Sequence, residues 1–179
     1  IAGGSTIVST AGSVALTGGD GALTDSVVIT GGAVTAANTV AITGGADAGG
    51  DSVQIESATV TATSGNVGIT GGSNAGSDSI QIFGGATVTA TAGAVTIAGG
   101  DDFADRSVII NNADVQAAGD VTVTTGDDSA PSGTNLQIAG GSTIVSTAGS
   151  VALTGADGAS ANSVQITGGA VTAANAVTI

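Results

Sequence analysis

The chain has almost none of the side chains that most catalytic and metal-binding sites require. Its 179 residues include no cysteine, histidine, methionine, tryptophan or tyrosine. Without cysteine and histidine the chain cannot build the usual zinc sites, a histidine-dependent catalytic triad or a cysteine nucleophile. It also cannot form a disulfide bond. The sequence therefore predicts a protein that is not an enzyme and that needs no cofactor.

Positive charge is nearly absent as well. Arg106 is the single basic residue against 14 acidic ones, and the formal net charge at pH 7 is −13. Nucleic acids and anionic membrane surfaces are bound through basic patches, so we expect neither as a partner. Mean hydropathy is +0.48. Because no apolar run approaches the roughly 18 residues that a membrane helix needs, we expect no membrane insertion.

A repeat of about 27 residues fills the chain. Five successive coils cover residues 26–51, 52–78, 79–106, 107–134 and 135–162, with lengths of 26, 27, 28, 28 and 28 residues. A fixed period in this range is typical of solenoids, in which each coil buries its apolar face against its neighbours. Each coil holds three short runs in which apolar and small polar residues alternate, and this period of two indicates β-strands.

Alignment of the coils places the inward residues in six columns of apolar residues, in which Ser146 is the only polar member. The first run gives Val27, Val53, Ile80, Val108, Leu136 and Val164, and Ile29, Ile55, Ile82, Ile110, Ile138 and Ile166. The second gives Val34, Val60, Val88, Val115, Ile144 and Val171, and Ala36, Ala62, Ala90, Ala117, Ser146 and Ala173. The third gives Val40, Val67, Val95, Val121, Val151 and Val177, and Ile42, Ile69, Ile97, Val123, Leu153 and Ile179.

These columns predict an all-β fold, a parallel β-helix (β-solenoid) with three strands per coil. Coils spaced by about 4.8 Å would make a rod of roughly 30 Å. Glycine pairs close the first strand, as at Gly31-Gly32, and the third strand, as at Gly44-Gly45. We expect glycine at both corners because tight corners need backbone angles that other residues resist.

A longer repeat lies over the short one. Residues 138–179 duplicate residues 1–42 at an offset of 137 residues, which equals five coils, and we expect the seven differing positions to lie in loops or on outward faces. The pattern is uncapped at Ile1 and Ile179, and bare strand edges accept further strands. We therefore expect residues 1–179 to be a single β-solenoid segment of a longer repeat array, or a unit that stacks end to end on itself.

The corner between the third strand of one coil and the first strand of the next carries most of the acidic residues. Asp25, Asp51 and Asp78 precede the first strand at one register. Oxygen-rich, glycine-rich loops suit Ca²⁺, so these three are weak calcium candidates. Exposed carboxylates about 5 Å apart repel by only about 0.9 kcal/mol in water. No cation is required, and the interpretation we favour is a solvated acidic edge without a metal.

Two further acidic patterns fall in this corner. A second approximate column consists of Asp20, Asp47, Asn74, Asp101, Asp127 and Asp157. The adjacent pairs Asp101-Asp102 and Asp127-Asp128 are the only arrangement that suggests acid–base chemistry. Neighbouring loop carboxylates rarely bracket a scissile bond, so we interpret both pairs as solvated turn residues.

Outward threonines form two ranks in adjacent coils, at positions 59, 61 and 63 and at positions 87, 89 and 91. Flat ranks of threonine can order water, as in ice-binding β-helices. The array breaks in the coils on either side, and threonine is simply a good strand residue. We therefore favour a structural role for these threonines.

The runs SVQITGGAVTAANAVTI (163–179) and GGATVTATAGAVTIAGG (84–100) resemble the filamentous-haemagglutinin-like exoproteins, the secreted β-strand-repeat adhesins of Gram-negative bacteria. The resemblance covers the whole chain. It implies a right-handed parallel β-helix, an extracellular or cell-surface location, and a role in adhesion or in biofilm matrix.

Together these observations predict a structural protein, a shaft or fibre segment of a large extracellular bacterial β-solenoid. Its expected partners are further coils of the same kind, with the cell surface or matrix as a second class of partner. The alternative function is an adhesin or calcium-dependent surface-binding module. A sugar-degrading β-helix is a weaker alternative, because it would need an irregular cleft and the coils are regular.

Overall fold

The structure is a computed structural model of the chain, and it describes residues 1–101, 104–127, 134–157 and 162–179. Every regular element in these residues is a β-strand, which confirms the predicted all-β class. No helix in the described residues is long and apolar enough to span a membrane.

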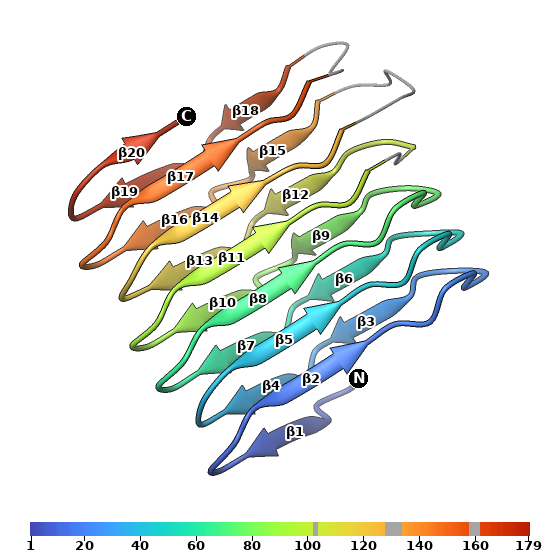
Figure 1. Cartoon of the computed structure of the whole chain (residues 1–179), viewed down its shortest axis with the longest axis horizontal. Helices are drawn as coiled ribbons and strands as arrows, with labels where there is room; N and C mark the ends of the chain where they lie inside the picture. Colours follow the sequence, from blue (N-terminus) through green and yellow to red (C-terminus); the bar gives the residue numbers. More distant parts are fainter. Residues whose placement is uncertain (102–103, 128–133, 158–161) are drawn as a thin grey trace.

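Three parallel sheets make up the fold, and consecutive strands of the chain belong to different sheets (Figure 1). Sheet A holds the first strand of each coil: β3 (Val27–Thr30), β6 (Val53–Glu56), β9 (Ile80–Phe83), β12 (Val108–Asn111), β15 (Leu136–Ala139) and β18 (Val164–Thr167). Sheet B holds the second: β1 (Thr6–Ser9), β4 (Ala33–Ala36), β7 (Thr59–Ala62), β10 (Thr87–Ala90), β13 (Asp114–Ala117), β16 (Thr143–Ser146) and β19 (Ala170–Ala173). Sheet C holds the third: β2 (Val14–Thr17), β5 (Val40–Thr43), β8 (Val67–Thr70), β11 (Val95–Ala98), β14 (Val121–Thr124), β17 (Val151–Thr154) and β20 (Val177–Thr178).

Each strand pairs with its counterpart in the next coil, in the register that the columns predict. In sheet A, Val27 pairs with Val53, and Val53 pairs with Ile80. Strands therefore recur about every 27 residues and stack in one direction, so the chain is a β-solenoid, as predicted from the repeat.

The inward columns form one apolar core that runs along the rod. Ile55, Ile82 and Ile110, which follow one another in one column, are each 0% exposed. Ser146, the polar member, is also buried, and its hydroxyl donates to the Gly119 carbonyl at 2.7 Å and accepts the Gly149 amide at 2.9 Å. Because both hydrogen bonds are made, a hydroxyl is tolerated in the core.

The corner between sheets A and B requires a left-handed backbone, as predicted. Gly31, Gly84, Gly140 and Gly168 have φ values of 61°, 68°, 64° and 69°. Ser57 and Asn112 hold the equivalent place in two coils, with φ values of 49° and 50°. A residue with a Cβ atom adopts this conformation at a cost of about 1–2 kcal/mol, so glycine is the preferred residue here.

The 137-residue duplication conserves the interior. Val28 and its counterpart Gln165 both lie at an outward position of sheet A, and Ala41 and Thr178 both lie at an outward position of sheet C. The counterparts of Leu23 and Thr24, at positions 160 and 161, fall outside the described residues. The described differences agree with the predicted loop and outward positions.

Candidate functional site

Acidic residues gather along one edge of the rod. Three of the 14 acidic residues, Glu56, Asp114 and Asp120, lie elsewhere, and the others fall between a third strand and the next first strand. This edge, where strands of sheet C lead into sheet A, follows the right-hand side of the view in Figure 1. We call it the acidic corner.

The structure places the three calcium candidates in one column, but it uses the carboxylates of Asp25 and Asp51 to join successive coils. Asp25 Oδ1 accepts the Asp51 backbone amide at 2.7 Å, and Asp51 Oδ1 accepts the Asp78 amide at 3.0 Å. At Asp51 and Asp78 the other oxygen, Oδ2, accepts the side-chain amide of the glutamine three residues further along the chain, since Gln54 Nε2 lies 3.3 Å from Asp51 Oδ2 and Gln81 Nε2 lies 3.3 Å from Asp78 Oδ2. The column is therefore a ladder of coil-to-coil hydrogen bonds.

Two of these carboxylates are not solvated, contrary to the sequence-based interpretation. Asp51 is 5% exposed and Asp78 is 3% exposed, whereas Asp25 is half-buried. The Asp51 carboxylate accepts the Asp78 backbone amide, and each of the two carboxylates accepts a glutamine side-chain amide, so protein groups rather than water surround them. The prediction of a solvated edge is wrong for Asp51 and Asp78.

The ladder stops at Asp78. Arg106 lies one coil above it, because the Ser79 amide donates to the Arg106 carbonyl at 2.9 Å. Asp78 Oδ1 is buried and accepts no hydrogen bond. Burial raises the pKa of Asp78 to about 7, and the Asp51 carboxylate adds to the rise, while Arg106 opposes it. Asp78 is therefore a buried acid whose charge is only partly compensated.

The described part of the chain contains no group of three or more acidic side chains arranged to hold a metal ion. Asp25, Asp51 and Asp78 share a column without sharing a coordination sphere. The Oδ1 atoms of Asp25 and Asp51 already accept hydrogen bonds from backbone amides. The structure gives no geometric reason to treat the three as ligands of one ion.

The second column of the acidic corner is exposed and is only partly joined. Asp20 Oδ1 accepts the Ala46 amide at 2.8 Å, and Asp101 Oδ1 accepts the Asp127 amide at 2.9 Å. Asn74 Nδ2 donates to Asp47 Oδ1 at 2.9 Å. For these residues the solvated interpretation agrees with the structure. Positions 102 and 128, the second members of the acidic pairs, lie outside the described residues.

A column of serines at the start of the first strand also joins the coils, and sequence reasoning missed it. The Ser52 hydroxyl donates to the Gly45 carbonyl at 3.1 Å and accepts the Gly72 amide, one coil further along, at 2.7 Å. The same pair of bonds recurs at Ser26, Ser79 and Ser107. The signal in the sequence was a serine at this register in five of the six coils.

The serines explain the glycines of the acidic corner. A Cβ atom on Gly18, Gly44, Gly71 or Gly99 would lie 1.9 Å from the Oγ atom of the serine that follows in the same corner. None of these four glycines has a positive φ. The expectation that these four glycines serve special backbone angles is therefore wrong, although Gly21, Asp47 and Asn74 further along the corner do have positive φ values. Glycine is needed at the four positions because a serine occupies the space that a side chain would fill.

One corner has neither the glycine nor the serine of the other corners. Thr125 stands where the other coils have the first corner glycine, and Asn135 stands where they have serine. The Thr125 hydroxyl accepts the Ala156 amide at 2.7 Å, a role that serine fills elsewhere, and Asn135 Nδ2 donates to the Ala156 carbonyl at 3.2 Å. The junction keeps its hydrogen bonds, although Asn135 Oδ1 is left buried without a partner.

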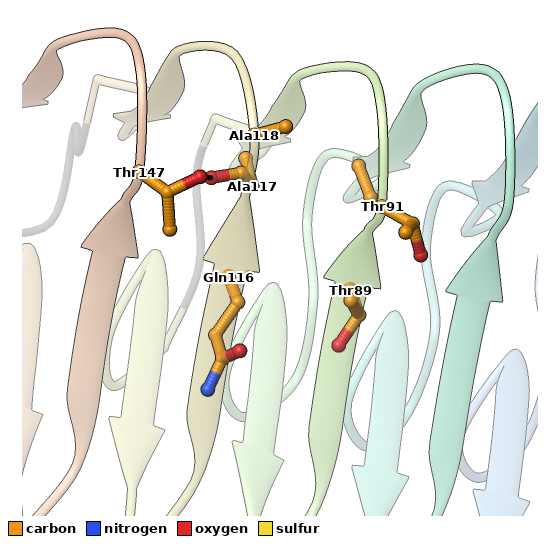
Figure 2. Close-up of a pocket in the computed structure, with 7 residues that line it drawn as sticks. Thr89, Thr91, Gln116, Ala117, Ala118 and Thr147 are labelled. Atoms are coloured by element: carbon orange, nitrogen blue, oxygen red, sulfur yellow. Dashed lines mark hydrogen bonds between the residues drawn. The ribbon is translucent and has the colours of Figure 1, made fainter.

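A shallow hollow of about 180 Å³ lies on the outer face of sheet B (Figure 2). It forms at Ala118, which has Thr91 in the coil before it and Thr147 in the coil after it. The Thr147 hydroxyl donates to the Ala117 carbonyl at 3.4 Å. No acidic or aromatic side chain lines the hollow, so it offers neither an acid–base pair nor a stacking surface for a sugar.

The threonine ranks lie on the same sheet. Thr59 and Thr87 face each other across neighbouring strands, and their hydroxyls are 3.3 Å apart. The next residue in that column is Asp114, whose carboxylate accepts a hydrogen bond from Thr143. The flat threonine array is thus interrupted where the sequence suggests.

Comparisons of the chain with protein-family models, with characterised proteins and with solved structures find no match. The fold is therefore known from the structure itself, and the likeness to filamentous-haemagglutinin-like exoproteins stays a prediction.

Proposed function

We propose that the chain is a structural element, a shaft or fibre segment of a large extracellular β-solenoid, whose main partner is more of the same coil. The observation that carries this proposal is the unbroken register of three sheets. Sheets B and C each run through seven strands and sheet A through six, with no strand out of order. A rod of this kind supplies length and stiffness rather than a pocket.

The junctions between coils support the proposal. Besides the strand ladders, serine hydroxyls and aspartate carboxylates accept backbone amides across the same junctions, as at Ser52 and Asp51. Each bond links positions about one coil apart, so the bonds all act along the rod axis. These side-chain hydrogen bonds join neighbouring coils of the same chain. Such a protein is suited to bear load along the rod axis.

The duplication also supports extension by repetition. The last described coil presents Val164, Val171 and Val177 at the positions that Val27, Val34 and Val40 occupy five coils earlier. The coil that follows residue 42 packs on the apolar columns of the first copy. The same coil placed after the second copy would pack on identical columns. Five-coil blocks can therefore be joined in phase without a change in side-chain complementarity.

The test is to measure how length follows block number. We would compare the 179-residue chain with a chain that carries one extra 137-residue block. Small-angle scattering should give the same cross-section and a length greater by roughly 24 Å, which is five coils at about 4.8 Å. Electron micrographs of native material should show rods or filaments, and a denaturing gel separates one long polypeptide from stacked short chains.

Two results would contradict the proposal. One is an added block that forms a second compact body beside the first rather than an extension of it. The other is native material that contains only a stable, compact species of about 16.2 kDa and no longer form under any condition. Antibody labelling of intact producing cells tests the extracellular location separately, and internal labelling alone would refute that part.

A further inference from the structure

Asp25, Asp51 and Asp78 each come just before the first strand of a coil and lie next to the coil above. For Asp78 that is the coil 107–134, whose first strand Arg106 precedes. The Asp25 carboxylate is half-buried and the Asp51 carboxylate is 5% exposed, and the Oδ1 atom of each accepts a backbone amide from the coil above. The Asp78 carboxylate is 3% exposed, and its Oδ1 atom has no partner. An unpaired buried carboxylate oxygen is costly when the group carries a charge, and far less so when it is protonated.

The groups around Asp78 do not remove this cost. Asp51, in the coil below, donates no hydrogen and brings a second buried negative charge. Gln81, three residues further along the chain, donates to Oδ2 from 3.3 Å, a long hydrogen bond. One coil above, the Arg106 guanidinium and the Arg106 backbone amide lower the pKa of Asp78, and Asp105 raises it, but Oδ1 accepts no hydrogen bond of normal geometry. The surroundings therefore contain two further carboxylates and one guanidinium.

We propose that Asp78 is a proton-sensitive joint in the rod. When Asp78 is protonated, the coils 79–106 and 107–134 hold together; when it is ionised, they separate more readily. The inference stands on the two buried carboxylates and the orphaned oxygen, and it does not depend on the proposed function as a fibre. It would make a rod that is firmer in mildly acidic surroundings than in alkaline ones.

The direction follows from the protonation states. The pKa of Asp78 is about 7 in the folded chain and near 3.8 in an unfolded one. The folded state therefore binds the proton more tightly, and the stabilisation is complete below about pH 4. It is lost progressively as the pH rises through about 7. No histidine or cysteine titrates in this window, because the chain contains neither.

The experiment is native-state hydrogen exchange of the full chain at pH 5 and pH 8, corrected for intrinsic exchange rates. The opening equilibrium at the Ile80 amide, which donates across the joint to the Ser107 carbonyl at 2.9 Å, and at the Ile82 amide of the same strand should rise at least about tenfold from pH 5 to pH 8. Asp78→Asn should abolish this rise, and asparagine is tolerated at this register because Asn162 occupies it in the last coil. Asp20→Asn is the matched control, since Asp20 lies in the same acidic corner but is exposed, and its Oδ1 atom accepts a backbone amide.

A direct titration of the Asp78 carboxyl tests the proposal without any substitution, and so it still applies if a variant folds poorly. The side-chain carboxyl carbon of Asp78, followed by carbon NMR in the unaltered chain, should titrate between pH 5 and pH 8. A carboxyl that shows no change in this range overturns the proposal, as does equal pH dependence in the unaltered chain and Asp78→Asn. If added Ca²⁺ at pH 8 suppresses opening as strongly as acid does, the joint is a cation site and the proton-sensitive joint is refuted.

Discussion

Replacement of Gly99 by alanine tests whether serine packing, rather than backbone conformation, requires glycine at the acidic corner. The new Cβ atom would lie 1.9 Å from Ser107 Oγ, 3.1 Å from Ser107 Cβ and 3.0 Å from Val108 Cγ2. Real Cβ atoms do not approach so closely, so the serine or the corner must move. Overpacking of this kind costs typically about 1–3 kcal/mol of unfolding free energy.

The partner substitution, Ser107→Ala, has a separate cost. It removes the acceptor of the Gly126 amide, which lies 3.0 Å from the hydroxyl, and both residues are buried. A buried amide left without a partner costs about 1–3 kcal/mol. The bond that the hydroxyl donates to Gly100, at 3.4 Å, is long and contributes less.

The double variant separates the two interpretations. Once the Oγ atom is gone, the alanine at position 99 meets only contacts of 3.0–3.1 Å, from which a small shift gives relief. We therefore expect the double variant to cost less than the sum of the two single variants, with a coupling of about 1–2 kcal/mol. Urea unfolding followed by circular dichroism measures all four corners of the cycle.

Gly68→Ala is the matched control, because a Cβ atom there meets nothing within 4 Å and φ is not in the left-handed region. Its expected effect is neutral, or stabilising by up to about 1 kcal/mol. Additivity of the Gly99 and Ser107 costs to within about 0.5 kcal/mol would refute the serine-packing argument. So would a Gly99→Ala variant that is as harmless as Gly68→Ala.

Two further predictions test the assignment of faces and the role of the aspartates. Ile82→Asp should lower the melting temperature severely, because Ile82 is 0% exposed and an unpaired charge in the core is costly, whereas the outward-facing Thr89→Asp should have a mild effect. Equal losses in the two variants would mean that the inward and outward assignments are wrong. Calcium should raise the melting temperature little or not at all, because Asp25 and Asp51 already bond to amides. A large calcium-dependent rise that disappears when Asp25, Asp51 and Asp78 are all replaced by asparagine would contradict this.

The strands and their register could be predicted from the sequence because both depend on a local pattern that is repeated. Alternation with period two assigns the faces, and a shift of one residue would expose every apolar side chain. The six copies then fix the alignment of one coil with the next, as the pairing of Val53 with Ile80 illustrates. The regularity that identifies the fold is the same regularity that sets the register.

The path of the acidic corner could not be predicted in the same way. Whether Asp51 and Asp78 face water or the next coil depends on how each loop folds back, and adjacent loops differ in length and composition. The two kinds of glycine corner could not be told apart in the sequence, because both carry a pair of glycines. Gly31 is needed for its φ of 61°, whereas Gly99 is needed to make room for a serine. The serine column carried a usable signal, since the serine repeats at one register just before five of the six first strands.

The coil that departs from the pattern explains what the repeat has to conserve. At the junction of Thr125 with Ala156 the hydroxyl comes from the residue that follows the third strand instead of from the residue that precedes the first strand, and the amide of the next coil still has its acceptor. Each corner amide therefore needs one hydrogen-bond acceptor at the junction, and different residues can supply it.

The 137-residue duplication agrees with this requirement. Its seven differences spare Gly18, Ser26 and Ser9, which recur as Gly155, Ser163 and Ser146. Where a corner residue does change, from Gly19 to Ala156, the junction uses only its backbone amide and carbonyl. Where Asp25 changes to Asn162, the side chain keeps an oxygen that can accept an amide. A solenoid can thus vary its coils from one to the next as long as every junction retains its hydrogen-bond partners and the apolar columns stay in line.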